Sequence, residues 1–175
     1  VVMEVKTGDI KAIANLEIGS DGLYHETYNY AVGESTEPGS TFKTFSLIAL
    51  LDDGKASITD TIHTGNGVYN FYGSNMTDHN ANKGGYHNIT LAEAIHASSN
   101  IGISRAVVKA YGNNPSAYVE KLYAMGFNEK MNIEIPGNDG PKIRHPKDKA
   151  RYWSKTTLPW MSIGYESQIP PIYTL

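Results

Sequence analysis

The sequence predicts one mixed α/β domain that joins several helices to a short antiparallel hairpin. A chain of 175 residues is long enough for one domain and short for two. Its hydrophobic content of 40% against a charged content of 19% predicts a packed core. Apolar residues alternate near the N-terminus, and later stretches carry helix start and stop signals.

The N-terminal residues predict the hairpin. In VVMEVKTGDIKAIANL, two alternating stretches flank a Gly8-Asp9 turn. Residues 17–38 are rich in Gly, Ser, Glu and Tyr without periodicity, which indicates a loop. The apolar run that follows predicts a helix from about Ser40 to Asp52.

The middle of the chain predicts a long irregular segment and then a helix. Residues 60–89 are rich in Gly, Asn and Tyr, which indicates loop with one short hairpin. Thr90 followed by Glu93 forms a capping-box pattern, so a helix should begin there. We expect it to break near residues 98–100.

Two further helices are predicted after this break. The stretch 101–112 ends at a glycine, and the stretch 114–126 has Asn-Pro at its start and Gly at its end. NIEIPGNDG, residues 132–140, is interpreted as a short strand or an extended loop, and PPIYTL, residues 170–175, as the start of another helix.

Composition excludes several classes of protein. A net charge of −3 without a block of like charges argues against a nucleic-acid surface. The absence of cysteine excludes disulfides and thiolate zinc sites. No run of apolar residues is long enough to span a membrane. Both ends lie within apolar runs, so we expect the chain to be a piece of a longer protein.

Ser40 and Lys43 form the first candidate pair. Three residues apart, they share one face of the predicted helix at its N-terminus. A serine becomes a nucleophile when a base takes its proton, and a lysine serves as that base when its pKa is lowered. Burial lowers it, and the helix supplies apolar neighbours: Phe42, Phe45, Leu47 and Ile48. The alternative is a capping serine with a lysine that extends to water.

Ser98-Ser99-Asn100, at the predicted helix break, is the second candidate element. A hydroxyl at Ser98 can pass a proton between Lys43 and a leaving amine, and the amide of Asn100 can hold the lysine and a peptide carbonyl. The alternative interpretation is an ordinary turn.

Together the two elements resemble the penicillin-binding protein family, which carries S-x-x-K followed by S-x-N. The resemblance extends over EPGSTFK, SSNIGIS, IEIPG and WSKTTLPWMSIGYESQIPP, and the N-terminal hairpin is similar to the family's first one. The patterns S-S-N-I-G and W-S…S-x-G-Y resemble the division-type class B transpeptidases most.

The family's third motif, K-T-G, has no counterpart after Asn100. The K-T-G at Lys6-Thr7-Gly8 precedes Ser40 and lies at the predicted hairpin turn. We therefore expect residues 1–175 to be a partial transpeptidase domain, truncated before the K-T-G strand. Such a piece should be inactive alone and should expose apolar surface, be partly disordered or self-associate.

The resemblance implies the penicillin-binding transpeptidase and serine β-lactamase-like fold, here incomplete: a helical subdomain plus the N-terminal hairpin of an antiparallel sheet. It implies a peptidoglycan D,D-transpeptidase that needs no cofactor and no metal. Ser40 would form the acyl-enzyme, Lys43 would take its proton, Ser98 would relay the proton to the departing D-Ala, and Asn100 would hold the substrate amide. The Ser40 N–H would supply one oxyanion donor.

The resemblance also implies partners and location. The substrates would be stem peptides ending in D-Ala-D-Ala, β-lactams would acylate the same serine, and no nucleic acid would be involved. Divisome or glycosyltransferase proteins would be partners in septal wall synthesis. The parent would be periplasmic and anchored in the inner membrane by a segment outside these residues.

Other interpretations remain open. A serine β-lactamase or β-lactam sensor would use the same nucleophile, and a non-catalytic domain would dock to cell-wall partners. Asp78, His79 and His87 could bind a metal, but a solvated loop is the stronger interpretation of these residues. Three aromatic residues could line a substrate groove or pack in the core: Trp153, Trp160 and Tyr165.

Overall fold

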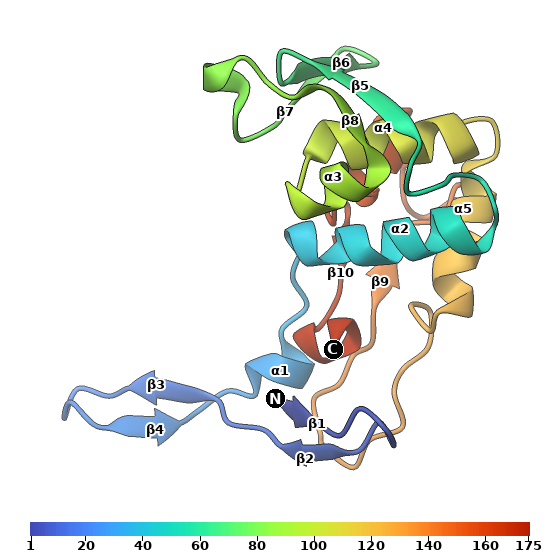
Figure 1. Ribbon diagram of the computed structural model, residues 1–175. Helices are drawn as coiled ribbons and strands as arrows, with labels where there is room; N and C mark the ends of the chain where they lie inside the picture. The colour runs from blue at the N-terminus through green and yellow to red at the C-terminus, as the bar shows by residue number, and fades with distance from the viewer.

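Most of the helices pack together, one short helix lies apart from them near the N-terminus, and the strands pair two by two (Figure 1). The computed structural model describes residues 1–175. The helices are α1 (Tyr30–Gly33), α2 (Lys43–Asp52), α3 (Leu91–His96), α4 (Asn100–Tyr111), α5 (Pro115–Ala124) and α6 (Thr157–Met161). The 3₁₀ turns are η1 (Gly39–Phe42), η2 (Ala81–Lys83) and η3 (Pro171–Thr174).

The strands form antiparallel pairs rather than one sheet. They are β1 (Val2–Met3), β2 (Ile10–Ala12), β3 (Leu16–Ile18), β4 (Tyr24–Glu26), β5 (Thr61–Gly65), β6 (Val68–Phe71), β7 (Ser74–Thr77), β8 (His87–Thr90), β9 (Lys142–Ile143) and β10 (Ser167–Gln168). The pairs are β1–β2, β3–β4, β5–β8, β6–β7 and β9–β10. The expected N-terminal hairpin is therefore present as β1–β2.

The helices predicted from local signals are confirmed. The Thr90 hydroxyl accepts the Glu93 N–H at 3.1 Å, and the Glu93 carboxylate accepts the Thr90 N–H at 2.7 Å, which is the predicted capping box. Helices α4 and α5 follow where expected, with Pro115 in the first position of α5.

Three segments differ from the prediction. Residues 17–38 are not all loop, because strands β3 and β4 pair and α1 follows them. All six residues of β3 and β4 are exposed, so no buried face imposes an apolar alternation on the sequence. Residues 60–89 hold the β6–β7 hairpin enclosed by the β5–β8 pair, where one hairpin was expected. PPIYTL forms only the 3₁₀ turn η3.

The core lies among α2 to α6. One cluster of 22 buried apolar residues joins these helices to β6, β7 and β8, and it includes Phe42 of η1, Leu50 of α2 and Tyr118 of α5. The hydroxyl of Ser46 ties α2 to its neighbours, because it donates to the Ser162 carbonyl at 2.7 Å and lies 2.7 Å from the Tyr118 hydroxyl. None of the helices combines the length and the apolar character that a membrane crossing requires.

Candidate active site

Ser40 lies on an exposed turn that leads into α2, a helix of the core. It is the second residue of η1, and α2 continues directly from that turn. Gly39 before it has a φ of +59°, a conformation that glycine adopts without steric cost. The Ser40 side chain is exposed, and its Oγ makes no hydrogen bond within the chain. Its carbonyl accepts the Lys43 backbone N–H, so both residues belong to one continuous turn.

Lys43 is buried, and its ammonium group is hydrogen-bonded to Ser98. Its side chain is only 1% exposed, and Nζ donates to the Ser98 carbonyl at 2.6 Å and to Ser98 Oγ at 3.0 Å. Burial lowers the pKa of Lys43 from 10.5 to about 8, although the charge of Asp78 acts in the opposite direction. A lysine in this setting can give up its proton near neutral pH and act as a base.

The Ser98–Asn100 turn forms the predicted break between α3 and α4. Ser98 has a φ of +51°, which turns the chain sharply and brings its carbonyl and hydroxyl to the lysine. Ser99 is the N-cap of α4, and its hydroxyl accepts the Gly102 N–H at 2.9 Å. A Cβ at Gly102 would lie 2.7 Å from that of Ala94, so glycine allows α3 and α4 to approach at this turn.

Asp78 supports this turn, which the sequence did not indicate. Its side chain is buried, and its carboxylate accepts the Ser99 hydroxyl at 2.7 Å and the Ile101 N–H at 3.1 Å. The carboxylate thus caps α4 where free N–H groups gather. Its weak assignment as a metal ligand is replaced by this capping role. The only hint in the sequence was Ser99, a residue type that favours helix N-caps, directly before the predicted helix.

Asn100 faces a different partner from the expected one. Its Nδ2 donates to the Thr77 carbonyl at 2.9 Å, at the end of β7, and the lysine is held by Ser98 instead. This contact fixes the S-S-N turn to the β6–β7 hairpin. A substrate contact of Asn100 stays a prediction.

The remaining candidates are dispersed. The ring of His79 lies 3.1 Å from the Tyr86 hydroxyl, and His87 is exposed. Trp153 and Trp160 pack against the core, which favours the packing interpretation, while Tyr165 is exposed.

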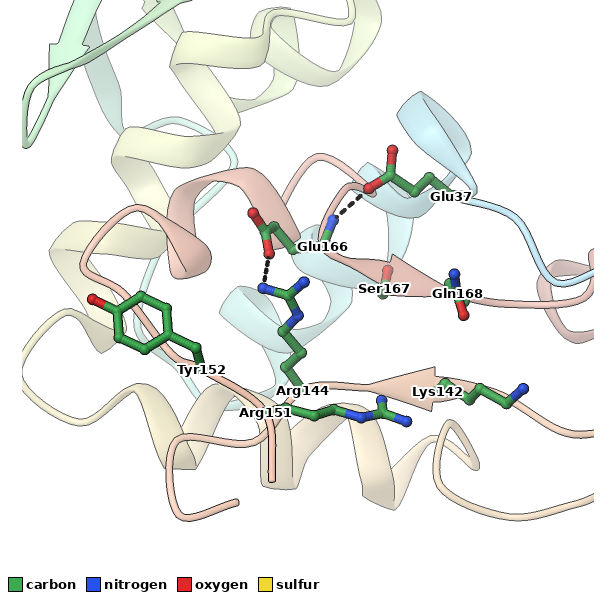
Figure 2. A pocket seen from close by; sticks show the side chains of 8 residues that line it. All are labelled: Glu37, Lys142, Arg144, Arg151, Tyr152, Glu166, Ser167 and Gln168. Carbon is green, nitrogen blue, oxygen red and sulfur yellow. Dashed lines mark hydrogen bonds and ion pairs between the residues drawn. The ribbon is translucent and has the colours of Figure 1, made fainter. Parts of the chain in front are cut away.

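A charged cavity of about 490 Å³ opens beside the turn that precedes Ser40 (Figure 2). Two basic residues that line it form ion pairs. Arg144 contacts Glu166, and Nζ of Lys142 lies 3.9 Å from the carboxylate of Asp139. Glu37, on the approach to Ser40, reaches the backbone of Glu166 across this cavity.

Comparison with known proteins places the chain in a family. The family model "Penicillin binding protein transpeptidase domain" matches residues 1–172, so the chain belongs to this family. It is 27% identical over 174 residues to a protein of Neisseria flavescens named "Probable peptidoglycan D,D-transpeptidase PenA", covering 97% of this chain and 40% of that protein. It is 28% identical to "Probable peptidoglycan D,D-transpeptidase PbpC" of Pseudomonas aeruginosa, covering 94% of this chain and 28% of that protein.

Solved structures confirm the fold class. The transpeptidase domain of Burkholderia pseudomallei penicillin-binding protein 3 superposes with a TM-score of 0.73 at 24% identity, covering 83% of this chain and 41% of that one. Penicillin-binding protein A of Mycobacterium tuberculosis, solved as a ceftriaxone acyl-enzyme, gives a TM-score of 0.68 at 20% identity, covering 84% of this chain and 32% of that one. The chain therefore spans well under half the length of these proteins.

Proposed function

We propose that residues 1–175 form part of a peptidoglycan D,D-transpeptidase domain and carry its nucleophile and its base. The observation that carries the proposal is the contact between buried Lys43 and Ser98, one turn after an exposed Ser40. Membership in the transpeptidase family and the names of the relatives support it.

The proposed first step is acyl transfer to Ser40. Lys43, in its neutral form, takes the proton of the Ser40 hydroxyl as Oγ attacks the penultimate D-Ala carbonyl. The Ser40 backbone N–H, near the start of η1, donates to the developing oxyanion. When the C–N bond breaks, Ser98 passes the proton from Lys43 to the departing D-Ala amine, which leaves an acyl-enzyme.

The second step is attack by an amine of a neighbouring stem peptide. The amine loses its proton along the same path in reverse, the ester to Ser40 breaks, and a cross-link forms. A β-lactam would acylate Ser40 in the same way. Asn100 would hold the donor amide after giving up its Thr77 contact or through its remaining oxygen.

The proposal extends to context through the motifs. The S-S-N-I-G and S-I-G-Y stretches favour a septal role with divisome or glycosyltransferase partners. Because stem peptides lie outside the cytoplasm, the parent would work in the periplasm, anchored to the inner membrane. The K-T-G at residues 6–8 lies in the β1–β2 turn, away from Ser40 in sequence, so residues 1–175 alone are proposed to be inactive.

The test is D-Ala release from a peptide ending in D-Ala-D-Ala, measured with the full-length parent and its Ser40→Ala variant. The proposal expects release and cross-linked product from the parent alone. Rapid turnover of nitrocefin without cross-linking would favour a β-lactamase instead. Equal D-Ala release by the Ser40→Ala variant would contradict the proposal.

A further inference from the structure

We propose that Glu37 is a positioning residue for the Ser40 nucleophile, held in place by the backbone N–H of Glu166. This inference rests on the proposed acyl-transfer function, since it assigns Glu37 the task of fixing the turn that carries the nucleophile. Glu37 lies on the approach to η1, three residues before Ser40.

The segment before Ser40 runs beside the segment that follows α6. The Gly39 N–H donates to the Gly164 carbonyl at 3.0 Å, and the Ile169 N–H donates to the Thr36 carbonyl at 2.8 Å. A Cβ at Gly164 would lie 2.0 Å from the Gly39 oxygen, so only glycine permits this approach. These two backbone contacts flank Glu37 on either side.

The Glu37 side chain completes this connection. Its Oε1 accepts the Glu166 N–H at 2.9 Å, and Figure 2 shows the carboxylate reaching over to the backbone of that residue. A hydrogen bond to a carboxylate is shorter and stronger than one between neutral groups. Because Glu37 is exposed, this bond contributes little to the buried core, and its removal should leave the fold intact.

Glu166 is itself held in an unusual conformation. Its φ is +61°, in the left-handed region that a non-glycine residue occupies only at an energetic cost. Its carboxylate forms an ion pair with Arg144, which follows β9 (Figure 2). A strained conformation of this kind persists where several surrounding contacts hold it. Here it directs the Glu166 N–H toward Glu37.

The consequence falls on Ser40, which is joined directly to Gly39. If the Glu37 contact is lost, the approach to η1 gains freedom and the hydroxyl leaves its place relative to the bound carbonyl. A misplacement of about 1 Å in a reacting group can cost on the order of a hundredfold in rate. Binding of the ligand before the reaction depends on this turn much less.

The experiment measures acylation of the full-length parent by a fluorescent penicillin, resolved into the acylation rate constant and the dissociation constant of the preceding complex. Glu37→Ala should lower the rate constant at least about tenfold and leave the dissociation constant within about threefold. Glu37→Asp, too short to reach, should show the same loss. Glu37→Gln keeps an acceptor oxygen and should recover most of the rate.

One control variant isolates the contact. Glu34→Ala removes an exposed glutamate that forms no hydrogen bond or ion pair, and it should acylate like the parent. Melting temperatures should agree across the set within about 3 °C.

Three results would overturn the inference. Glu37→Ala and Glu37→Asp could both acylate as fast as the parent. Glu37→Gln could be as slow as Glu37→Ala. A parent that no penicillin acylates would refute the proposed function itself, and the inference with it.

Discussion

The helical core and the N-terminal hairpins differ in how firmly their side chains are fixed. In the core, Leu50 is fully buried and Lys43 is 1% exposed, while in β3 Leu16 and Ile18 are 57% and 67% exposed. The residues proposed for chemistry belong to the first region or border it. The comparison shows that the packed helices position the reactive groups, whereas the apolar side chains of the N-terminal hairpins remain exposed.

The largest expected effect follows from Lys43→Met in the full-length parent. Loss of the base should slow acylation by a fluorescent penicillin on the order of a thousandfold. Met matches the apolar part of the lysine, so the melting temperature should not fall.

Lys109→Met is the matched control, because Lys109 is exposed on α4 and forms no ion pair. It should acylate at the parental rate. A Lys43→Met protein that is folded and acylates normally would remove the lysine from the mechanism.

Asp78→Ala should give the next largest effect, on stability. The Ser99 hydroxyl and the Ile101 N–H would lose their buried acceptor, at a cost of about 2–3 kcal/mol in the free energy of unfolding. Urea denaturation measures this cost. Asp60→Ala, in a solvent-exposed turn, should cost less, and equal costs would contradict the capping role of Asp78.

The pH dependence sharpens the comparison further. The neutral form of Lys43 is the base, so the acylation rate should rise with pH, and the midpoint of this rise should lie near pH 8. Asp78→Asn removes the charge that raises the pKa of Lys43, so the midpoint should move to lower pH. The range from pH 6 to pH 9 extends about one to two units on either side of the expected midpoint. A flat profile over this range would contradict the lowered pKa of Lys43.

The same lowered pKa has a consequence for stability. Because the folded state disfavours charged Lys43, the lysine destabilises the fold most below pH 8, and this penalty fades as pH rises from about 8 toward 10.5. Lys43→Met should therefore exceed the parent in free energy of unfolding by an amount that shrinks over this window. Denaturation at pH 7 and pH 9.5 measures the difference, and a constant difference would count against the shift.

The smallest effect is expected in the hairpins. Ile18→Ser on β3 removes an exposed side chain and should change the free energy of unfolding of residues 1–175 by less than about 0.5 kcal/mol. Leu50→Ala in α2 should cost about 2–5 kcal/mol in the same assay. Similar costs at the two positions would contradict the contrast between the regions.

The sequence predicted what short-range signals determine. The capping box at Thr90, the helix over 40–52 and the break at residues 98–100 each depend on neighbours within a few positions, and each is present. The sequence also predicted that burial would lower the pKa of Lys43, and burial is the main cause of the lowered pKa.

The contacts that escaped prediction join distant segments. Asp78 meets Ser99 across 21 positions, and Glu166 meets Glu37 across 129. No local pattern encodes such pairs. Strands β3 and β4 were missed for a different reason, since three exposed residues each give no periodicity to detect.

Mapping the residue that a β-lactam modifies tests the proposed chemistry most directly. The full-length parent would be incubated with benzylpenicillin, digested, and analysed by mass spectrometry. We predict one penicilloyl adduct, on the peptide that contains Ser40, and none in the Ser40→Ala variant. An adduct on another serine, or a folded parent without any adduct, would contradict the assignment of Ser40 as the nucleophile.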